Sequence, residues 1–223
     1  MSVKVVAVTK PLLWVDNDSR QMNVNEFVAF VARVSNPSNQ NNTLTANKLL
    51  RYLITHKHFS PFEMVDIVME INTTRDIARQ ILRHRSFSFQ EFSQRYADPT
   101  KDLGFVTREA RLQDQSNRQN SIEVDDKELQ EQWDLQQTLV LNAASKAYNL
   151  AIELGIAKEQ ARAVLPEGLT CSRLYMKGSL RSWLHYCQLR CANGTQKEHQ
   201  EIAKLAWSEV VNIFTSMEGL INE

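Results

Sequence analysis

Fourteen consecutive residues, Arg83 to Tyr96, gather a high density of groups that bind anions. They include three arginines, one histidine, one glutamate and three serines. Cations this close together destabilise a fold unless anionic partners compensate them, and the planar guanidinium group suits bidentate binding of phosphate or carboxylate. A solvated, arginine-rich helix end explains the same composition about equally well. The residues before and after the stretch have to decide between these two interpretations.

Two other parts of the chain carry similar donors, at 56–60 and at 162–190. Taken alone, His58 beside Ser60 is more typical of a surface histidine, and Arg162 before Pro166 of a surface ion pair. Arg190 follows an apolar run, so a half-buried guanidinium there needs a partner. For Arg190 the functional and structural interpretations are equally favoured.

Several kinds of chemistry lack their usual motifs in this sequence. There is no glycine-rich dinucleotide turn, no phosphate loop and no nucleophile elbow, and the six glycines are not clustered. Cys171, Cys187 and Cys191 lack an activating neighbourhood, which disfavours thiol catalysis. Cys187 and Cys191 with His185 leave a zinc site open, but buried thiols are favoured. The remaining donors are typical of an enzyme that positions phosphorylated ligands and uses an organic cofactor.

Composition restricts the class of protein. The 223 residues are 43% apolar, and 26 basic residues balance 26 acidic ones. A net charge of zero argues against binding to nucleic acid through a basic surface, and it weakly favours self-association. The first residues do not resemble a signal peptide, no apolar run is long enough for a membrane span, and the cysteine number is odd. We therefore expect a cytoplasmic protein, or one of the host cytoplasm if the chain is viral.

The elements that position these donors alternate between strands and helices. Strands are expected at 3–9, 62–72 and 169–178, from β-branched residues and alternation. Helices are expected after Asn23 or Asn25, from about Thr45, after Thr73 or Thr74, up to Gly155, at 158–165, from Ser179 and at 196–217. The longest helix carries an apolar stripe that is interrupted only by Gln136. The polar segment 97–126 lacks periodicity, which is typical of a lid or an insertion.

This order of elements predicts one α+β domain over residues 1–223, with a central mixed or antiparallel sheet and several helices. The helix after Thr74 is expected to present Gln80, Arg83 and His84 on one side. The basic stretch then begins at a helix C-terminus, where the helix dipole favours cations.

Several segments together resemble the flavin-dependent thymidylate synthases. Arg83-His84-Arg85, followed after seven residues by Ser93, is the arrangement that marks this family. His58-Phe59-Ser60-Pro61-Phe62-Glu63 is also similar to a family segment, as are 78–80, 93–96, 118–121, 161–166 and 180–190. The matching segments lie in the right order between about residues 30 and 205. A three-residue motif would be weak support, but a collinear set is strong.

The resemblance implies conversion of dUMP to dTMP in an α/β homotetramer whose active sites are shared between subunits. The carbon would come from 5,10-methylenetetrahydrofolate and the hydride from FAD that NADPH has reduced. Partners would be dUMP, folate and NADPH, without nucleic acid or membrane. Carried over, the flavin-binding residues are Ser35, Ser60, Arg83, His84, Arg85, Glu91, Ser179, Arg181 and His185. The nucleotide-binding residues are Gln80, Arg83, Glu91, Ser93, Gln94, Arg95, Arg162 and Arg190.

The resemblance also implies that Arg190 and His58 are the catalytic residues, with His58 beside the flavin ring and the folate. A guanidinium group on the uracil imide would stabilise negative charge on the ring and so replace a cysteine nucleophile. The chain departs from the family pattern at Ser179, where many members have asparagine, and at Gln94, where glycine is frequent. These departures leave open a hydroxymethylated product.

Two further hypotheses compete with thymidylate synthesis. A nucleic-acid-binding module would use Arg83, Arg85 and Arg95 with neighbouring phenylalanines, and its binding would weaken steeply with salt. An inactive structural homologue would bind nucleotide without turnover.

Overall fold

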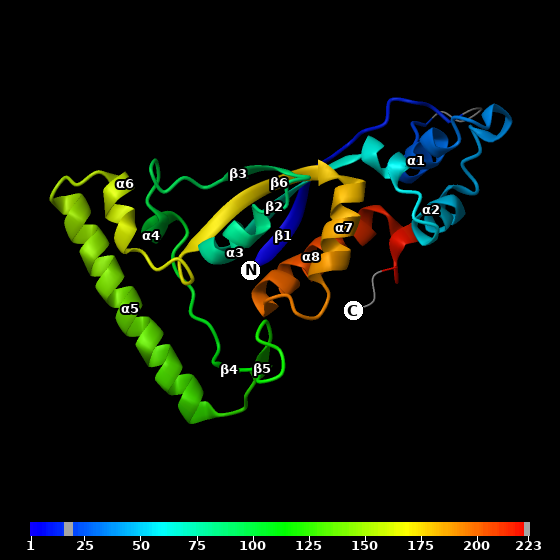
Figure 1. The fold of residues 1–223 in the computed structure, drawn as a ribbon. Helices are drawn as coiled ribbons and strands as arrows, with labels where there is room; N and C mark the ends of the chain where they lie inside the picture. The colour runs from blue at the N-terminus through cyan, green and yellow to red at the C-terminus, as the bar shows by residue number, and fades with distance from the viewer. Residues whose placement is uncertain (16–19, 221–223) are drawn as a thin grey trace.

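The computed structural model describes residues 1–15 and 20–220. Its centre is a four-stranded sheet in the order β1-β2-β6-β3 (Figure 1). The strands are β1 (Ser2–Val8), β2 (Asp66–Thr74), β6 (Cys171–Ser179) and β3 (Ser88–Glu91). All three pairings are antiparallel. The predicted α+β fold around an antiparallel sheet is therefore confirmed.

One face of the sheet forms the core. Ile67, Met69 and Ile71 alternate along β2 and are fully buried, as the sequence pattern predicts. Helices α3 (Arg75–Ile81), α7 (Leu180–Arg190) and α8 (Lys197–Ile213) pack on this face. The opposite face is polar: the Tyr175 hydroxyl donates to Glu70 at 2.8 Å, and Lys177 pairs with Asp66 at 2.8 Å. The helices that carry Gln80, His185 and Arg190 therefore lie on the covered side of the sheet.

Two helices lie at one end of the sheet, shown in blue at the upper right of Figure 1. They are α1 (Val24–Ala32) and α2 (Ala46–Thr55), with the 3-10 helices η1 (Pro37–Asn39), η2 (Ser60–Met64) and η4 (Thr215–Met217). Asn23 begins α1 with a capping box, in which Asn23 Oδ1 accepts from the Glu26 amide at 3.0 Å and Glu26 accepts from the Asn23 amide at 2.8 Å.

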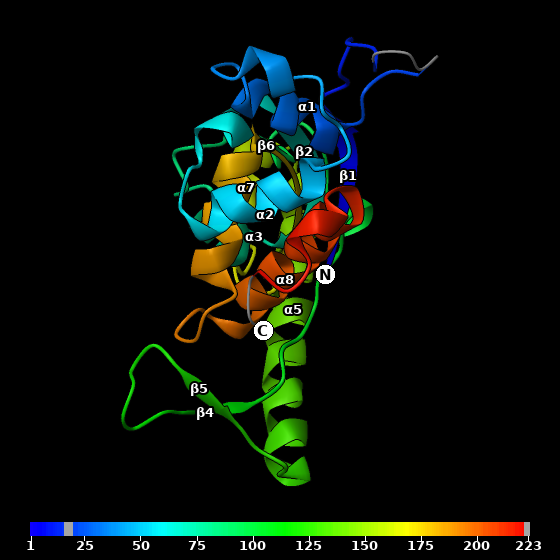
Figure 2. The same cartoon turned by 90° about the vertical axis from the view of Figure 1, so that its right-hand side faces the viewer.

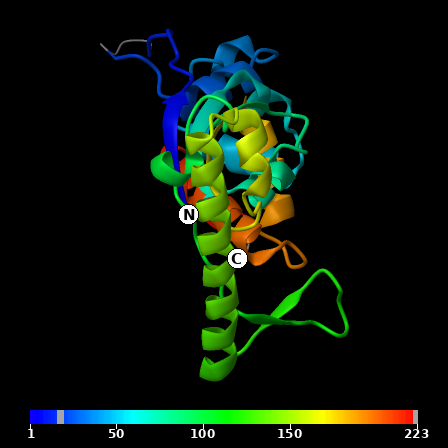
Figure 3. The ribbon, with the colours of Figure 1, turned by 90° about the vertical axis from the view of Figure 1, so that its left-hand side faces the viewer.

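The other end of the molecule carries a long arm. It consists of α5 (Lys127–Glu153), which extends beyond the body in Figures 2 and 3, and the short α6 (Lys158–Ala161) and η3 (Arg162–Val164). Asp126 begins α5 by accepting from the Leu129 amide at 3.0 Å, and Gly155 ends it with φ of 76°, as predicted. None of the helices in the described part of the chain is long and apolar enough to span a membrane.

Segment 97–126 is organised by side chains of α5. It contains α4 (Pro99–Asp102) and a hairpin of β4 (Arg111–Gln113) and β5 (Ser121–Glu123). The carboxamide of Gln137 accepts from the Arg108 amide at 2.8 Å and donates to the Arg108 carbonyl at 2.9 Å. Gln130 binds the amide and carbonyl of Ala110 at 2.7 and 2.9 Å. The two glutamines thus replace the neighbouring strand that an extended segment otherwise needs.

The structure differs from the sequence expectations in several places. Strand β2 begins at Asp66 rather than near Phe62, because Ser60–Met64 forms a 3-10 helix. Helix α3 ends at Ile81, so Arg83 and His84 lie in the turn beyond it and not on its side. Strand β3 and the β4–β5 hairpin were not expected. Of the predicted apolar stripe on α5, Ala144 is buried, whereas Trp133, Val140 and Leu154 are exposed.

Candidate active site

One aromatic ring anchors the basic stretch to the sheet. Phe87 is buried and meets Trp183 edge to face, with ring centroids 4.9 Å apart. Gly178 on β6 leaves room for this ring, since a Cβ at 178 would lie 2.4 Å from Phe87 Cδ1. The anchor holds the turn between α3 and β3, and Arg83 and Arg85 are exposed on that turn.

Several predicted flavin-binding residues meet around Glu63. The Ser179 hydroxyl donates to Glu63 Oε2 at 2.5 Å, and Arg181 donates to Oε1 at 3.0 Å. Ser179 also begins α7 by accepting from the Ser182 amide at 3.3 Å, as predicted. His185, one turn along α7, packs edge to face on Phe59 at 4.7 Å. This group presents hydroxyl, guanidinium and imidazole donors on neighbouring elements.

Three further members of the predicted flavin and catalytic sets lie on exposed turns. Ser60 is the first residue of η2, and His58 precedes it after Lys57, whose φ of 60° is left-handed. Ser35 lies in the turn after α1. All three side chains are open to ligands from solvent.

Arg190, at the end of α7, is held by the motif histidine. Its Nε–H donates to His84 Nε2 at 3.0 Å. Burial, together with Arg190 and then Arg83, lowers the pKa of His84 to about 4. His84 is therefore neutral at pH 7 and can accept this hydrogen bond, which fixes the position of the guanidinium group.

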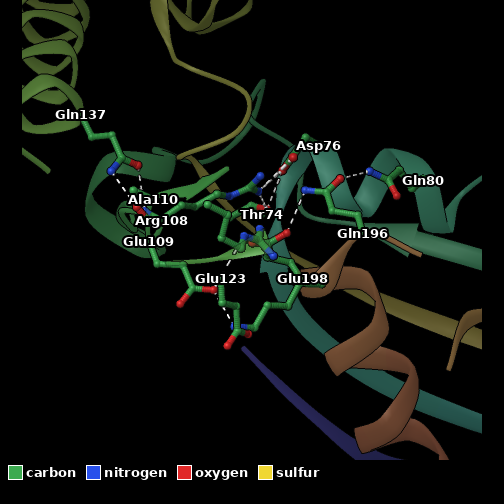
Figure 4. A network of polar contacts seen from close by, with 12 residues as sticks. Thr74, Asp76, Gln80, Arg108, Glu109, Ala110, Glu123, Gln137, Gln196 and Glu198 are labelled. Atoms are coloured by element: carbon green, nitrogen blue, oxygen red, sulfur yellow. Dashed lines mark hydrogen bonds and ion pairs between the residues drawn. The ribbon is translucent and has the colours of Figure 1, made fainter. Parts of the chain in front are cut away.

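Gln80, on the last turn of α3, lies in a polar network with residues of α7 and α8. Its Nε2 donates to Gln196 Oε1 at 2.7 Å, and its Oε1 lies 3.2 Å from His199 Nδ1. Figure 4 shows Gln80 and Gln196 facing one another, with Glu198 beyond them. A carboxamide with this many partners has little freedom to rotate.

Other predicted nucleotide-binding residues lie towards the arm. Glu91 accepts from Ser172 at 2.7 Å and from Arg75 at 3.3 Å. Arg95 pairs with Glu159 at 3.2 Å, and its backbone amide lies 3.4 Å from Ser93 Oγ.

A cavity of about 430 Å³ lies beside these residues. Its lining includes Arg75, Arg79, Gln94 and Arg162. Gln94 Nε2 is buried and has no hydrogen-bond partner among the described residues. Glu159 and Glu167 also line the cavity, and Arg79 pairs with Glu167. The unpaired donor of Gln94 and the guanidinium groups suit an anionic ligand that replaces such a carboxylate.

Within one chain, most of the predicted site residues fall into three groups, while Ser35, His58, Ser60, Arg83 and Arg85 lie apart from these groups on exposed turns. The first surrounds Glu63, the second is Gln80, His84 and Arg190, and the third surrounds the cavity at Arg162. Among residues 1–15 and 20–220, no hydrogen bond links members of different groups. Their gathering around one flavin and one nucleotide stays a prediction, because the resemblance implies that several copies share each site.

Sequence reasoning did not identify several residues that hold the predicted ones. Arg75 holds Glu91, and Gln196 and His199 contact Gln80. Glu198 holds Gln196 in turn, and Tyr186 holds His199. Glu63 was visible in the sequence only as part of a matching segment. The one available signal at α8 was the cluster Gln196, Glu198 and His199 at the start of a predicted helix. Cys187 and Cys191 are buried while His185 is exposed, which favours structural thiols over a zinc site.

Comparison with known proteins places the chain in a family. The family model described as thymidylate synthase complementing protein matches residues 19–214. A probable flavin-dependent thymidylate synthase of Paramecium bursaria Chlorella virus 1 is 44% identical over 217 residues, covering 97% of each chain. A flavin-dependent thymidylate synthase of Synechocystis sp. is 47% identical over 206 residues, covering 92% of each.

The fold also matches a solved structure. A UMP/dUMP methylase from Streptomyces cacaoi, crystallised with 5-Br dUMP, superposes with a TM-score of 0.77 at 24% identity, over 97% of this chain and 93% of that one. At this identity the match supports the fold alone. On the family model and the near full-length relatives, the chain belongs to the flavin-dependent thymidylate synthase family.

Proposed function

We propose that this flavin-dependent thymidylate synthase makes dTMP from dUMP with the carbon of 5,10-methylenetetrahydrofolate and with FAD that NADPH has reduced. The observation that carries the proposal is the contact between Arg190 and neutral His84, which fixes a guanidinium group at the end of α7. Arg190 would stabilise negative charge that develops on the uracil ring. With the charge stabilised in this way, the reaction would need no thiol nucleophile. The cysteines agree with this, because burial raises the pKa of both Cys187 and Cys171, so neither is a ready nucleophile.

The donors present suit a flavin dinucleotide. Its two phosphates need charge-assisted donors, and the chain offers exposed Arg83 and Arg85 with Arg181 on α7. Ser35, Ser60, His84, Glu91, Ser179 and His185 complete the proposed flavin-binding set, and His58 would lie beside the ring. Bound flavin supplies hydride chemistry, which side chains alone lack. Ser179 is occupied by Glu63 in the free chain, so a flavin contact there would replace or share that hydrogen bond.

The nucleotide would be held by the groups around Gln80 and Arg162. The phosphate dianion would take donors from Ser93, Gln94, Arg95 and Arg162, and Gln94 brings the unpaired donor. Glu91 would accept from the nucleotide, because a carboxylate only accepts. Gln80, Arg83 and Arg190 would complete the proposed set.

We further propose one domain over the whole chain and a homotetramer with shared active sites. The exposed apolar side chains of α5 support an assembly, because monomers rarely leave such a stripe open. The separation of the three residue groups supports shared sites, since one chain alone does not bring them around a common ligand.

The decisive assay measures dTMP formation with FAD, NADPH and 5,10-methylenetetrahydrofolate, and with each omitted in turn. Arg190→Ala is expected to lower the rate by about 100-fold or more, as loss of a preorganised donor typically does. Arg51→Ala, an exposed arginine on α2, serves as the matched control. A wild-type protein that binds dUMP without turnover would contradict the proposal, and product mass separates a methyl from a hydroxymethyl group.

A further inference from the structure

Gln80 lies between His199 and Gln196, and His199 in turn contacts Tyr186. His199 is fully buried, and Tyr186 beside it is 1% exposed. Their polar atoms meet, with His199 Nε2 lying 3.1 Å from the Tyr186 hydroxyl and His199 Nδ1 lying 3.2 Å from Gln80 Oε1. On its other side, Gln80 meets Gln196. Both hydrogen-bonding ends of the carboxamide are therefore engaged.

The network continues to an ion pair at the β4–β5 hairpin (Figure 4). Gln196 Nε2 donates to Glu198 Oε2 at 2.9 Å, and the other carboxylate oxygen of Glu198 accepts from Arg111. The side chains of Glu198 and Arg111 are both 11% exposed. Glu198 lies in the first turn of α8, where the helix dipole favours a negative charge.

The carboxylate of Glu198 sets the direction of every hydrogen bond in this network. A carboxylate only accepts, so Gln196 must turn its NH₂ group to Glu198 and its oxygen to Gln80. Gln80 then turns its own NH₂ to Gln196 and its oxygen to His199. His199 must carry its proton on Nδ1, which leaves Nε2 to accept from the Tyr186 hydroxyl. Reversing any one of these bonds would place two donors or two acceptors together.

The state of His199 agrees with this direction. Burial, together with Arg190 and then His84, lowers the pKa of His199 to about 3, so the ring is neutral at pH 7. A neutral imidazole has one donor and one acceptor, as the network requires.

We propose that Glu198 and His199 are positioning residues that fix which way the Gln80 carboxamide faces, so that one N–H and one lone pair are always presented to the nucleotide. The inference rests on the proposed function, in which Gln80 contacts dUMP. It assigns Glu198 a role at a distance, transmitted through Gln196. It also connects the β4–β5 hairpin to nucleotide binding, because Arg111 holds the carboxylate in place.

The direction of the hydrogen bonds in this network is tested first in the unaltered holoenzyme, by ¹⁵N NMR with labelled histidine. The His199 signal, identified by its loss in His199→Phe, is expected to show a protonated Nδ1 and an unprotonated Nε2. A proton on Nε2 would overturn the proposal, and this measurement depends on neither activity nor dUMP.

Substitutions then test the effect on dUMP binding. In Glu198→Gln the donors Arg111 and Gln196 compete for one amide oxygen, so the fixed direction is lost. The Kd for dUMP is then expected to rise by roughly 2- to 10-fold, with KM affected more than kcat. Glu198→Asp, which keeps the acceptor, is expected to restore part of the affinity. Glu201→Gln, one turn further along α8, makes the same chemical change outside the network and is the control.

Exchanging the two charges separates the direction of the hydrogen bonds from the attraction between Glu198 and Arg111. Glu198→Lys combined with Arg111→Glu keeps an ion pair but offers Gln196 a donor, which reverses the network. A merely structural ion pair would be restored by the exchange. The proposal instead expects dUMP affinity at least as weak as in Glu198→Gln, with a proton on His199 Nε2. Unchanged affinity in both variants, while wild-type enzyme makes dTMP, would refute the inference and leave the proposed function intact.

Discussion

Two tryptophans show how differently the central core and the α5 arm of this protein use apolar residues. Trp183, on α7, is fully buried against the sheet, and its indole N–H donates to the Ile67 carbonyl at 3.2 Å. Trp133, on α5, is 44% exposed, and Leu139 six residues later is 55% exposed. Both belong to helices with apolar residues at regular spacing. The side chains around Trp183 are covered within one chain, whereas those around Trp133 are left exposed.

The difference teaches that a helical apolar stripe predicts a buried face but not what covers it. The face of α5 turned towards the body carries polar contacts, such as Gln137 with Arg108. Its apolar side chains point elsewhere, which fits the proposed contact with another copy. The carboxamide side chains of α5 thus attach the arm to its own chain, and its exposed apolar side chains are available to a partner.

The largest expected effect comes from removing the core tryptophan. Trp183→Ala should lower the free energy of unfolding by about 3–5 kcal/mol, because it opens a cavity in the core and removes the hydrogen bond from the indole to the Ile67 carbonyl. Trp133→Ala should cost less than Trp183→Ala in a dissociated chain, because the Trp133 ring is already 44% exposed. Urea unfolding of both variants measures this contrast, and equal losses would show that the arm folds as part of the core.

Acid should also lower the stability of the core, which contains His84 and His199. It should affect α5 less, because that helix has no histidine. The folded pKa values, about 4 and about 3, lie below the unfolded value of about 6.5. The unfolded chain therefore binds more protons below pH 6.5, and stability present above that pH is lost as pH falls. For one such histidine the slope reaches about 1.4 kcal/mol per pH unit.

Urea unfolding at pH 6.5, 5.5 and 4.5 checks this expectation. His199→Gln should flatten the slope, whereas His58→Gln, at an exposed turn, is the control. A slope that His199→Gln leaves unchanged would contradict a neutral buried His199.

A smaller effect is expected where the arm meets its own chain. Gln137→Ala should cost about 1–2 kcal/mol, because it leaves the amide and carbonyl of Arg108 without their partner. Hydrogen exchange at the Arg108 amide should accelerate in this variant. Gln136→Ala, at the exposed neighbouring position, should leave that exchange rate unchanged, so equal acceleration in both variants would refute the assigned contact.

The smallest change in the free energy of unfolding is expected on the exposed apolar face of α5. A substitution there should change the assembly of the protein instead. Leu139→Glu should alter the unfolding free energy of a dissociated chain by less than about 0.5 kcal/mol, because the side chain is already exposed. It should lower the mass measured by analytical ultracentrifugation, because a charge would be buried between copies. Thr138→Glu on the polar face adds the same charge as a control. A mass equal to that of the unaltered protein would exclude this face from the proposed interface.

Much of the fold could be predicted from the chain alone because its core elements carry strong local patterns. The alternation of Ile67, Met69 and Ile71 and the caps at Asn23 and Ser179 all have the expected roles. Strand β3 was missed because Ser88–Glu91 is short and depends on pairing with β6. The exposed apolar side chains of α5 were not foreseen, because a helical stripe alone does not show what covers it.

The site divides in the same way. The motif residues could be placed from the collinear segments, but their partners could not. Gln80 and Gln196 are separated by 116 positions and meet only because α8 packs beside α3. The partners of Glu91 likewise come from distant segments, with Ser172 lying 81 positions away.

The pairing of Gln130 and Gln137 with segment 108–110 limits how this protein can change length. Seven residues make nearly two full turns, so both carboxamides leave α5 on the same side. Inserting or deleting a single residue between them would rotate one amide by about 100° away from its backbone partner. Length variation among descendants of this sequence should therefore accumulate beyond position 137, where the phase of the helix is not set by these two amides.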